Sequence, residues 1–139
     1  MNYLLDTCVL SEFTCREPEE KVIRWVDSID EEKIFISVIT LGEIQRGVER
    51  LPESAHKTEL LVWMNTALSE RLAGRMLPLD ASTMLLWGSL TARLERLGQP
   101  LPVMDSLIAA IALQHSLIIA TRNLADFSIT GVQVINPWE

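Results

Sequence analysis

The sequence predicts an α/β fold in which a central, mainly parallel sheet of about five strands, in the order 3-2-1-4-5, lies between layers of helices. Short apolar runs alternate with longer segments of helical periodicity, which is the pattern of a parallel sheet covered on both faces. Acidic or amide residues follow several runs, as expected where ligands bind at the carboxyl ends of strands. The expected strands are residues 3–5, 34–38, 76–79, 117–120 and 132–135.

Length and composition predict one domain spanning residues 1–139. A chain of this length with 48% apolar residues can bury one core and is short for two ordinary domains. The amino terminus has no basic leader. The longest uncharged run, 106–121, includes Gln114 and His115 and falls short of the roughly 18 apolar residues that suggest a membrane span. We therefore expect a cytoplasmic protein without membrane attachment.

The helices of the first half follow from caps and apolar spacing. Pro18 and the acidic pair after it predict a helix that runs to about Ile29. A second helix is expected to begin at Thr40, directly after the second strand. Residues 54–72 carry one apolar stripe, and Gly74 supplies the stop after it.

The second half repeats the alternation. Pro78 limits residues 76–79 to an edge strand, because proline cannot donate a ladder hydrogen bond. Asp80 caps a helix that ends at Gly98. The segment after Asp105 is apolar nearly all round, which predicts a helix buried in the core.

Five residues with oxygen ligands stand near the expected carboxyl edge of the sheet: Asp6, Glu43, Asp105, Asn123 and Asp126. Asp6 closes the first strand, and in the order 3-2-1-4-5 that strand lies at the switch point, between the strands that precede Glu43 and Asn123. Carboxylates gathered there from distant parts of the chain are what a divalent-metal site needs. The pattern therefore predicts a metal-dependent nuclease.

Each of these residues also has an ordinary structural explanation. Asp6 can cap the turn at 7–12. Glu43 ends Thr40-Leu41-Gly42-Glu43, which fits a capping box. Asp105 can cap its helix, and Asn123 and Asp126 are common residue types in turns. Independent caps need not all fall on one edge of one sheet, so their coincidence favours the metal site.

The formal net charge of −7 counts against a nuclease, because phosphate backbones attract Lys and Arg. A cation would neutralise part of the acidic cluster, and basic residues can gather on one rim. An acidic surface also suits a basic protein partner. The candidates for a basic rim are Arg46, Arg50, Arg71, Arg75, Arg93, Arg96 and Arg122.

The remaining residue patterns predict packing. Trp25, Trp63 and Trp87 lie on helical apolar stripes and are expected in the core. Cys8 and Cys15 have no CxxC spacing and are expected to be packed thiols. No Ser-His-Asp order and no phosphate-binding glycine loop can be assembled, which argues against a serine hydrolase or a nucleoside-triphosphate enzyme.

Four motifs in order carry a family resemblance over essentially the whole length. They are Leu4-Leu5-Asp6-Thr7, Thr40-Leu41-Gly42-Glu43, Asp105-Ser106-Leu107-Ile108-Ala109-Ala110 and Thr121-Arg122-Asn123-Leu124-Ala125-Asp126-Phe127. With this set the chain resembles the PIN-domain family, and in particular the VapC-type toxins of bacterial toxin-antitoxin pairs. The Asn136-Pro137-Trp138 ending resembles the FitB branch of that group.

The resemblance implies a PIN-like three-layer sandwich and an RNA endonuclease that depends on Mg2+ or Mn2+. It also implies a homodimer, held inactive by a small antitoxin whose basic carboxyl-terminal segment enters the acidic site, and a larger hetero-oligomer with that antitoxin on DNA. Asp6, Glu43 and Asp105 match the family's first three acidic residues. Asn123 and Asp126 are alternatives for the fourth, so one or two metals are both open. Cys8 stands where most relatives carry Asn.

The expected roles follow from metal chemistry. Asp6 and Asp105 are the primary ligands of a cation that activates water for in-line attack on phosphorus. Glu43 ligates through water or acts as the base, and Asn123 or Asp126 orients the second metal or the water.

The resemblance further assigns Thr7, Thr121 and Arg122 to substrate binding, with Arg122 on phosphate. Two rival functions stay open. The first is an inactive PIN-like module that only binds a partner. The second is a haloacid-dehalogenase-type phosphatase, which Cys8 disfavours because that group needs Asp there.

Overall fold

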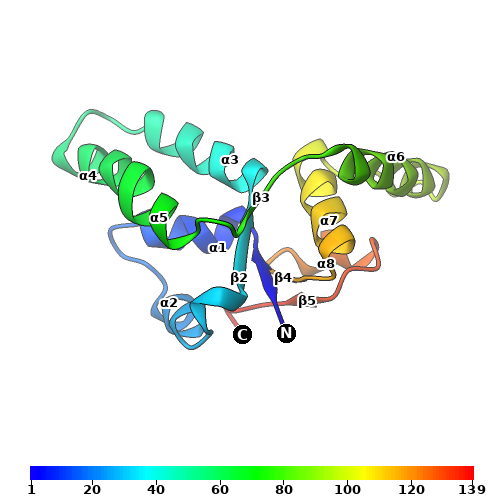
Figure 1. The fold of residues 1–139 in the computed structure, drawn as a ribbon, viewed down its shortest axis with the longest axis horizontal. Helices are drawn as coiled ribbons and strands as arrows, with labels where there is room; N and C mark the ends of the chain where they lie inside the picture. Colours follow the sequence, from blue (N-terminus) through cyan, green and yellow to red (C-terminus); the bar gives the residue numbers. More distant parts are fainter.

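A computed structural model describes all residues from 1 to 139 and contains a five-stranded, all-parallel sheet (Figure 1). Its strand order is β3-β2-β1-β4-β5, which confirms the expected fold class and order. The strands are β1 (Tyr3–Leu5), β2 (Ile34–Ser37), β3 (Met76–Leu77), β4 (Ile118–Ala120) and β5 (Val134–Ile135).

Helices cover both faces of the sheet (Figure 1). The segments from α1 to α5 lie on one side and those from α6 to α8 on the other. The first group contains α1 (Thr7–Ser11), η1 (Glu12–Thr14), α2 (Glu20–Asp27), η2 (Glu31–Lys33), α3 (Val38–Glu49), α4 (Ala55–Trp63), the π-helical turn η3 (Met64–Leu68) and α5 (Ser69–Arg71). The second contains α6 (Ala81–Arg96), α7 (Val103–His115) and α8 (Leu124–Ser128).

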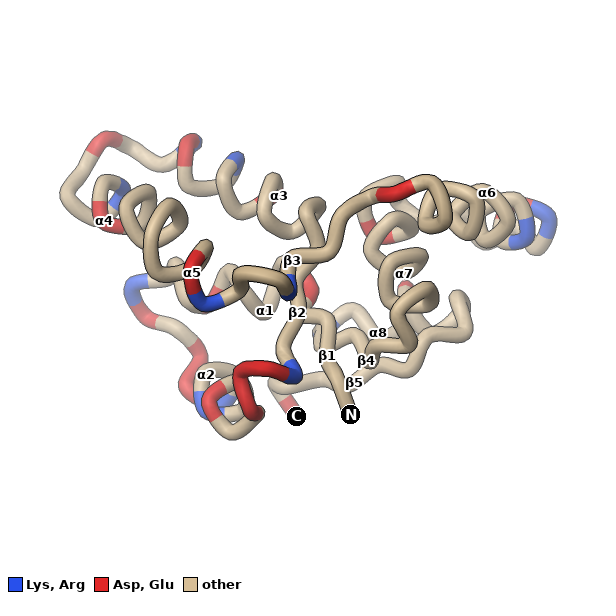
Figure 2. Tube along the Cα trace, viewed as in Figure 1, with Lys and Arg blue, Asp and Glu red and all other residues tan.

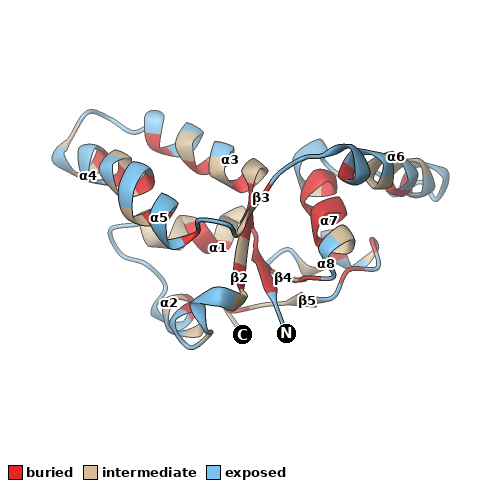
Figure 3. Ribbon diagram, viewed as in Figure 1, coloured by how far each residue is buried: buried red, intermediate tan, exposed pale blue.

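Two hydrophobic cores result from the alternation of side chains along the strands (Figure 3). Leu5 and Ala120 belong to the core beneath α1 to α5. Their neighbours Leu4 and Ile119 belong to the core beneath α6 to α8. Both cores are needed because a parallel sheet exposes an apolar surface on each face.

Helix α7 is the most deeply buried helix, as its all-round apolar sequence predicts. Every residue from 106 to 112 is buried. The polar Ser106 is accommodated because its hydroxyl donates to the Val103 carbonyl and accepts from Trp87 Nε1. Trp87 itself lies on α6 and is half-buried, whereas the apolar stripe of this helix predicted a place in the core.

Several expected boundaries shift by a few residues. Helix α3 begins at Val38, because the Ser37 hydroxyl caps it by accepting from Thr40 N at 3.1 Å. Helix α7 begins at Val103 after Pro102, two residues before Asp105. Strand β3 ends at Leu77, immediately before Pro78, which lacks the N–H that a further ladder bond needs.

The expected 54–72 helix is a nearly continuous rod, made of α4, the π-helical turn η3 and α5. Gly74 follows with a positive φ of 80°, a conformation that favours glycine. Trp63 lies in this rod and is half-buried against the first core. Trp25 is also half-buried and packs its ring edge-on to Tyr3, with centroids 5.1 Å apart. None of the helices is both long and apolar enough to span a bilayer.

Candidate active site

The register of the central strands brings Asp6 and Thr121 together. Leu5 pairs with Ala120 across β1 and β4, so the residues that follow them leave the sheet side by side. The ladder continues one step further, since Asp6 N donates to the Ala120 carbonyl at 3.0 Å. This edge is the switch point, because β1 has β2 on one side and β4 on the other.

Asp6 is a buried carboxylate with hydrogen-bond donors at both oxygens. Its side chain is 3% exposed. Oδ1 accepts from Thr7 N at 2.8 Å, which is the expected cap of α1. Oδ2 accepts from the Thr121 hydroxyl at 2.8 Å and from the Cys8 thiol at 3.6 Å. Asp6 is therefore both a helix cap and a member of a long-range polar cluster, since the two roles use different oxygens.

Glu43 does not form the capping box expected from Thr40-Leu41-Gly42-Glu43. Ser37 caps α3 instead, and Glu43 lies one turn further in, half-buried. Its Oε1 accepts from the Thr7 hydroxyl at 2.5 Å, and that hydroxyl lies 3.2 Å from Thr40 Oγ1. The structural explanation of Glu43 was therefore wrong, because its partner comes from α1 and not from its own helix.

Asp105 is likewise not a helix cap. The N-cap of α7 is Pro102, and Asp105 lies half-buried within the first turn. Burial, followed by the negative charges of Asp6, Asp126 and Glu43, raises the pKa of its carboxyl from 3.8 to about 6. The charges of three carboxylates from three other segments are thus close enough to act on Asp105.

The turn after β4 carries the two candidates for a fourth position. Asn123 is exposed and precedes α8, and its backbone N donates to Thr121 Oγ1 at 3.0 Å. Asp126 is exposed in the first turn of α8, and its charge contributes to the raised pKa of Asp105. By charge and proximity, Asp126 belongs to the acidic cluster.

The expected substrate-binding residues occupy different environments. Thr7 is half-buried and holds Glu43, whereas Thr121 is fully buried and holds Asp6. Arg122 is about half exposed, forms an ion pair with Glu12 at 3.8 Å and stacks on the Trp138 ring at 4.3 Å. The Trp138 ending thus fixes Arg122 beside the site, a contact for which the sequence gives no local signal.

Cys8 lies at the acidic edge, half-buried between Asp6 and Thr121, with its Sγ 3.6 Å from Asp6 Oδ2 and from Thr121 Oγ1. Burial, followed by the charge of Asp6, raises the pKa of this thiol, so it is uncharged at neutral pH. Cys15 is exposed, contrary to the expectation that both cysteines are packed.

The donor set fits a hard divalent cation, because it consists of carboxylate, hydroxyl and amide oxygens. No three His, Cys, Asp or Glu side chains form a ready geometry for holding an ion. Asp6, Asp105 and Glu43 are the side chains that could converge on a cation.

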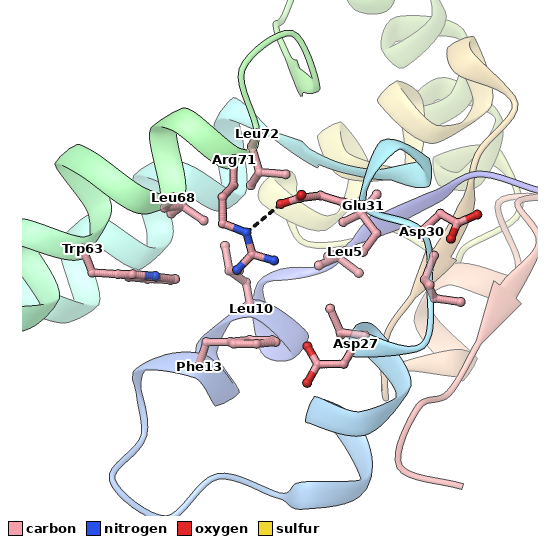
Figure 4. A pocket seen from close by; sticks show the side chains of 13 residues that line it. Leu5, Leu10, Phe13, Asp27, Asp30, Glu31, Trp63, Leu68, Arg71 and Leu72 are labelled. Atoms are coloured by element: carbon pink, nitrogen blue, oxygen red, sulfur yellow. Dashed lines mark hydrogen bonds and ion pairs between the residues drawn. The ribbon is translucent and has the colours of Figure 1, made fainter.

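A second feature is an apolar pocket of about 360 Å³ between α1, α2 and the α4–α5 rod (Figure 4). Leu10, Phe13 and Trp63 form part of its wall. Arg71 reaches across it to Glu31, with Nε 2.6 Å from Oε1. None of the five candidate site residues lines it. Sequence inspection missed this pocket because its walls come from four separate segments.

The fold and the acidic edge define a PIN-type protein, and comparison with known proteins agrees. Residues 3–131 match the PIN-domain family, and the chain therefore belongs to that family.

The relatives of the chain include proteins named as a toxin and as a ribonuclease. It is 36% identical to the toxin FitB of Neisseria gonorrhoeae, across 97% of either chain. It is 33% identical to the VapC ribonuclease Y4jK of Sinorhizobium fredii, across 98% of this chain and 97% of the relative. Among solved structures, FitAB bound to a DNA fragment superposes with a TM-score of 0.93 and 35% identity, covering 99% of this chain and 96% of that one.

Asp105→Asn is expected to stabilise the protein in EDTA at neutral pH and to have no such effect in acid. With a pKa raised from 3.8 to about 6, the ionised carboxylate disfavours the folded state. That penalty is absent below about pH 4, grows between about pH 4 and 6, and is complete above that range. Since Asp105 is only half-buried, solvent screening limits the gain to about 1 kcal/mol at neutral pH.

Urea unfolding of both proteins from pH 4 to pH 8 measures this difference. Glu59→Gln is the matched control, because Glu59 is an exposed carboxylate on α4 and its removal changes the net charge equally. A gain that is the same at every pH, or equal to that of the control, would contradict the assignment.

Proposed function

We propose that this chain is a divalent-metal-dependent RNA endonuclease and the toxin of a toxin-antitoxin pair. The observation that carries the proposal is the raised pKa of Asp105, caused by burial and by the charges of Asp6, Asp126 and Glu43. A cluster of carboxylates that repel one another at the switch point of a parallel sheet is a site suited to a cation. The kinship with VapC ribonuclease Y4jK supports RNA as the substrate.

Asp6 and Asp105 would hold Mg2+ or Mn2+ directly, and Glu43 would hold it directly or through water. When bound, such a cation supplies Lewis acidity toward a phosphate oxygen and lowers the pKa of water. The protein's contribution is to hold its carboxylates ionised and oriented. Asp6 is suited to this because its two oxygens already accept three hydrogen bonds.

The hydroxyl groups have positioning roles in this proposal. Thr121 orients Asp6, and because it is fully buried it acts through Asp6 and not by touching RNA. Thr7 orients Glu43, which would accept the proton of the attacking water if it serves as the base. Asp126 or Asn123 would orient that water from the opposite side of the edge.

Arg122 would neutralise a phosphate of the bound RNA. Its guanidinium is half exposed, and its present partners are Glu12 and the Trp138 face. Both contacts restrict its rotamers while leaving part of the charge accessible to solvent. A phosphate would compete with Glu12, whose mostly buried carboxylate lies 3.8 Å from the Arg122 guanidinium.

The apolar pocket of Figure 4 is the proposed docking site of the antitoxin. Its interior is lined by large apolar side chains, and Asp27, Asp30 and Glu31 stand among its lining. Figure 2 shows that acidic residues gather on the segment between α2 and β2, beside this pocket. Apolar walls with an acidic rim suit a peptide that carries apolar anchors and basic residues. By analogy with DNA-bound FitAB, the pair would assemble on DNA.

A homodimer would form through the outer face of α6 and the start of α7. Leu85 is 76% exposed and Val103 is 61% exposed, and Met84 and Met104 are also exposed. Exposed apolar side chains gathered on two packed helices mark an interaction surface. These helices lie on the far side of the sheet from the apolar pocket (Figure 1), so dimerisation and antitoxin binding do not compete.

Asp6→Asn and Asp105→Asn are each expected to abolish cleavage of total bacterial RNA in Mg2+ or Mn2+. The loss should exceed the roughly 10- to 100-fold cost of removing an outer-sphere partner of a metal ligand. Gel electrophoresis of RNA incubated with the purified chain, free of any partner, measures the loss of cleavage, with EDTA and Glu59→Gln as controls.

Thr121→Val, which removes one hydrogen bond from Asp6, should weaken Mn2+ binding in titration calorimetry by about 10-fold or more.

Cleavage that survives in EDTA or in both Asn variants would refute the metal site. A wild-type chain that is folded yet inert in both metals would favour the rival function, a PIN-like module that only binds its partner.

Trp63→Ala and Asp30→Lys are expected to reduce capture of the proposed antitoxin when the two proteins are co-expressed. The first removes an apolar wall of the pocket, and the second reverses a charge at its rim. Co-purification followed by calorimetry of the purified pair measures the effect. Val62→Ala is the control, since Val62 neighbours Trp63, is 56% exposed and lies outside the pocket. Unchanged affinity in both pocket variants would exclude this docking site.

Leu85→Glu is expected to convert the dimer to a monomer, because it places a charge in the proposed apolar interface. Sedimentation equilibrium gives the mass directly. Val62→Glu adds the same charge at an exposed apolar position of α4 and should leave the dimer intact. The proposal fails if the wild type is monomeric, or if only the control dissociates.

A further inference from the structure

A second cavity begins at Glu43 and is distinct from the apolar pocket. It has a volume of about 400 Å³ and lies between the η1 segment and helices α3 and α4. That volume is within the roughly 300 to 1,000 Å³ typical of sites for small organic molecules. Glu43 is the only member of the acidic cluster that lines it. The cavity therefore adjoins the candidate active site on the side of Glu43.

The walls of this cavity are polar on one side and apolar on the other. Thr14 ends η1, Cys15 and Arg16 belong to the loop that follows it, and His56 comes from α4. The loop is held in place by local bonds. Thr14 Oγ1 donates to the Ser11 carbonyl at 2.7 Å, and His56 Nε2 lies 3.1 Å from the Thr14 carbonyl. The polar wall is thus tied to α4 through a contact spanning 42 positions in the chain.

Gly47 keeps the opposite wall open. It lies on α3 one turn after Glu43, and a Cβ built there would meet no atom within 4 Å. The space beside it is therefore not filled by any other side chain. A helical glycine costs stability relative to alanine, so an open wall at this position needs a reason beyond folding.

The charge of the cavity differs from that of the whole chain. Arg16 is exposed and takes part in none of the ion pairs, in a protein whose net charge is −7. Glu43 is the one carboxylate in the lining, and a cation bound at the acidic edge would offset it. An unpaired guanidinium beside a metal site favours an anionic ligand.

We propose that this cavity binds the nucleotide next to the scissile phosphate, with the base between Gly47 and His56 and the flanking phosphate on Arg16. The proposal rests on the nuclease function and names the part of the site that selects the RNA. Single-stranded RNA is read by splaying bases into pockets, where imidazole or guanidinium planes stack on them. Hydroxyl and imidazole groups in the same wall can hydrogen-bond a base edge or a 2′-OH.

A basic peptide is the other conceivable occupant, and the charges disfavour it. Arg16 would repel the basic segment that the acidic rim of the apolar pocket attracts. The two cavities are thus matched to two ligands of opposite charge.

Gly47→Phe fills the cavity and is expected to lower kcat/KM for RNA cleavage by about tenfold or more, mainly through KM, because base stacking is lost. The added side chain meets no clash at Cβ, so the fold should persist. Gly42→Phe is the matched control, since Gly42 is an exposed glycine of the same helix, also without a Cβ clash, and lies outside the cavity. Mn2+ calorimetry on Gly47→Phe separates loss of RNA binding from damage to the metal site.

Protection of Cys15 from alkylation provides a readout that does not depend on cleavage. Cys15 is exposed and lines the cavity. Partial burial, followed by the charge of Glu12, raises the pKa of its thiol, so labelling is done at mildly alkaline pH and read by mass spectrometry. The probes are a mixed-sequence oligoribonucleotide and a basic peptide, each added to the Asp105→Asn variant so that RNA stays intact. We expect the oligoribonucleotide alone to protect Cys15.

The outcomes separate the two proposals. RNA cleavage with unchanged kinetics in Gly47→Phe, together with no protection by RNA, overturns the nucleotide subsite and leaves the nuclease standing. Protection by the peptide alone also overturns it and assigns the cavity to the protein partner. Protection of Cys15 by RNA, combined with a wild-type chain that is folded and cleaves no RNA, supports the subsite and refutes the nuclease.

Discussion

The pairing of β1 with β4 is the constraint on which the rest of the site depends. Because Leu5 lies opposite Ala120, the chain leaves both strands at the same level, and Asp6 meets the Thr121 hydroxyl. Asp6 is buried, and an ionised carboxylate without partners would be costly there. The long-range bond from Thr121 and the cap bond from Thr7 N satisfy it. A shift of this register would separate Asp6 from Thr121 and leave the carboxylate short of a donor.

Hydroxyl groups orient two carboxylates of the acidic cluster, Asp6 and Glu43. Thr121 donates to Asp6, and Thr7 donates to Glu43 while lying beside Thr40, which in turn contacts the Ser37 hydroxyl. A hydroxyl can fix a carboxylate without neutralising it, whereas a Lys or Arg would cancel its charge. The repulsion at Asp105 therefore persists, and it is this unneutralised charge that makes the edge suited to a cation.

The acidic character of the chain does not make its surface uniform. Acidic residues border the apolar pocket near α2, an unpaired Arg16 borders the cavity beside Glu43, and exposed apolar side chains mark α6. Each chemistry suits a different ligand: a basic peptide, an RNA and a second copy of the chain. Their separation on the fold lets a net charge of −7 coexist with the proposed action on a polyanion.

The sequence by itself determined the α/β class, because apolar periodicity is a local property of the chain. Its ordered motifs pointed to the strand order, which the structure confirms, and nominated the acidic residues of the candidate site. It offered a capping box for Glu43 and a helix cap for Asp105 as competing structural explanations, and neither cap forms, since Ser37 caps α3 and Asp105 lies within the first turn of α7. Only the tertiary structure decided the partners of the carboxylates. Thr7 and Glu43 are 36 positions apart, and Asp6 and Thr121 are 115 apart. Contacts of that range depend on strand register and helix packing, which no short window of sequence specifies.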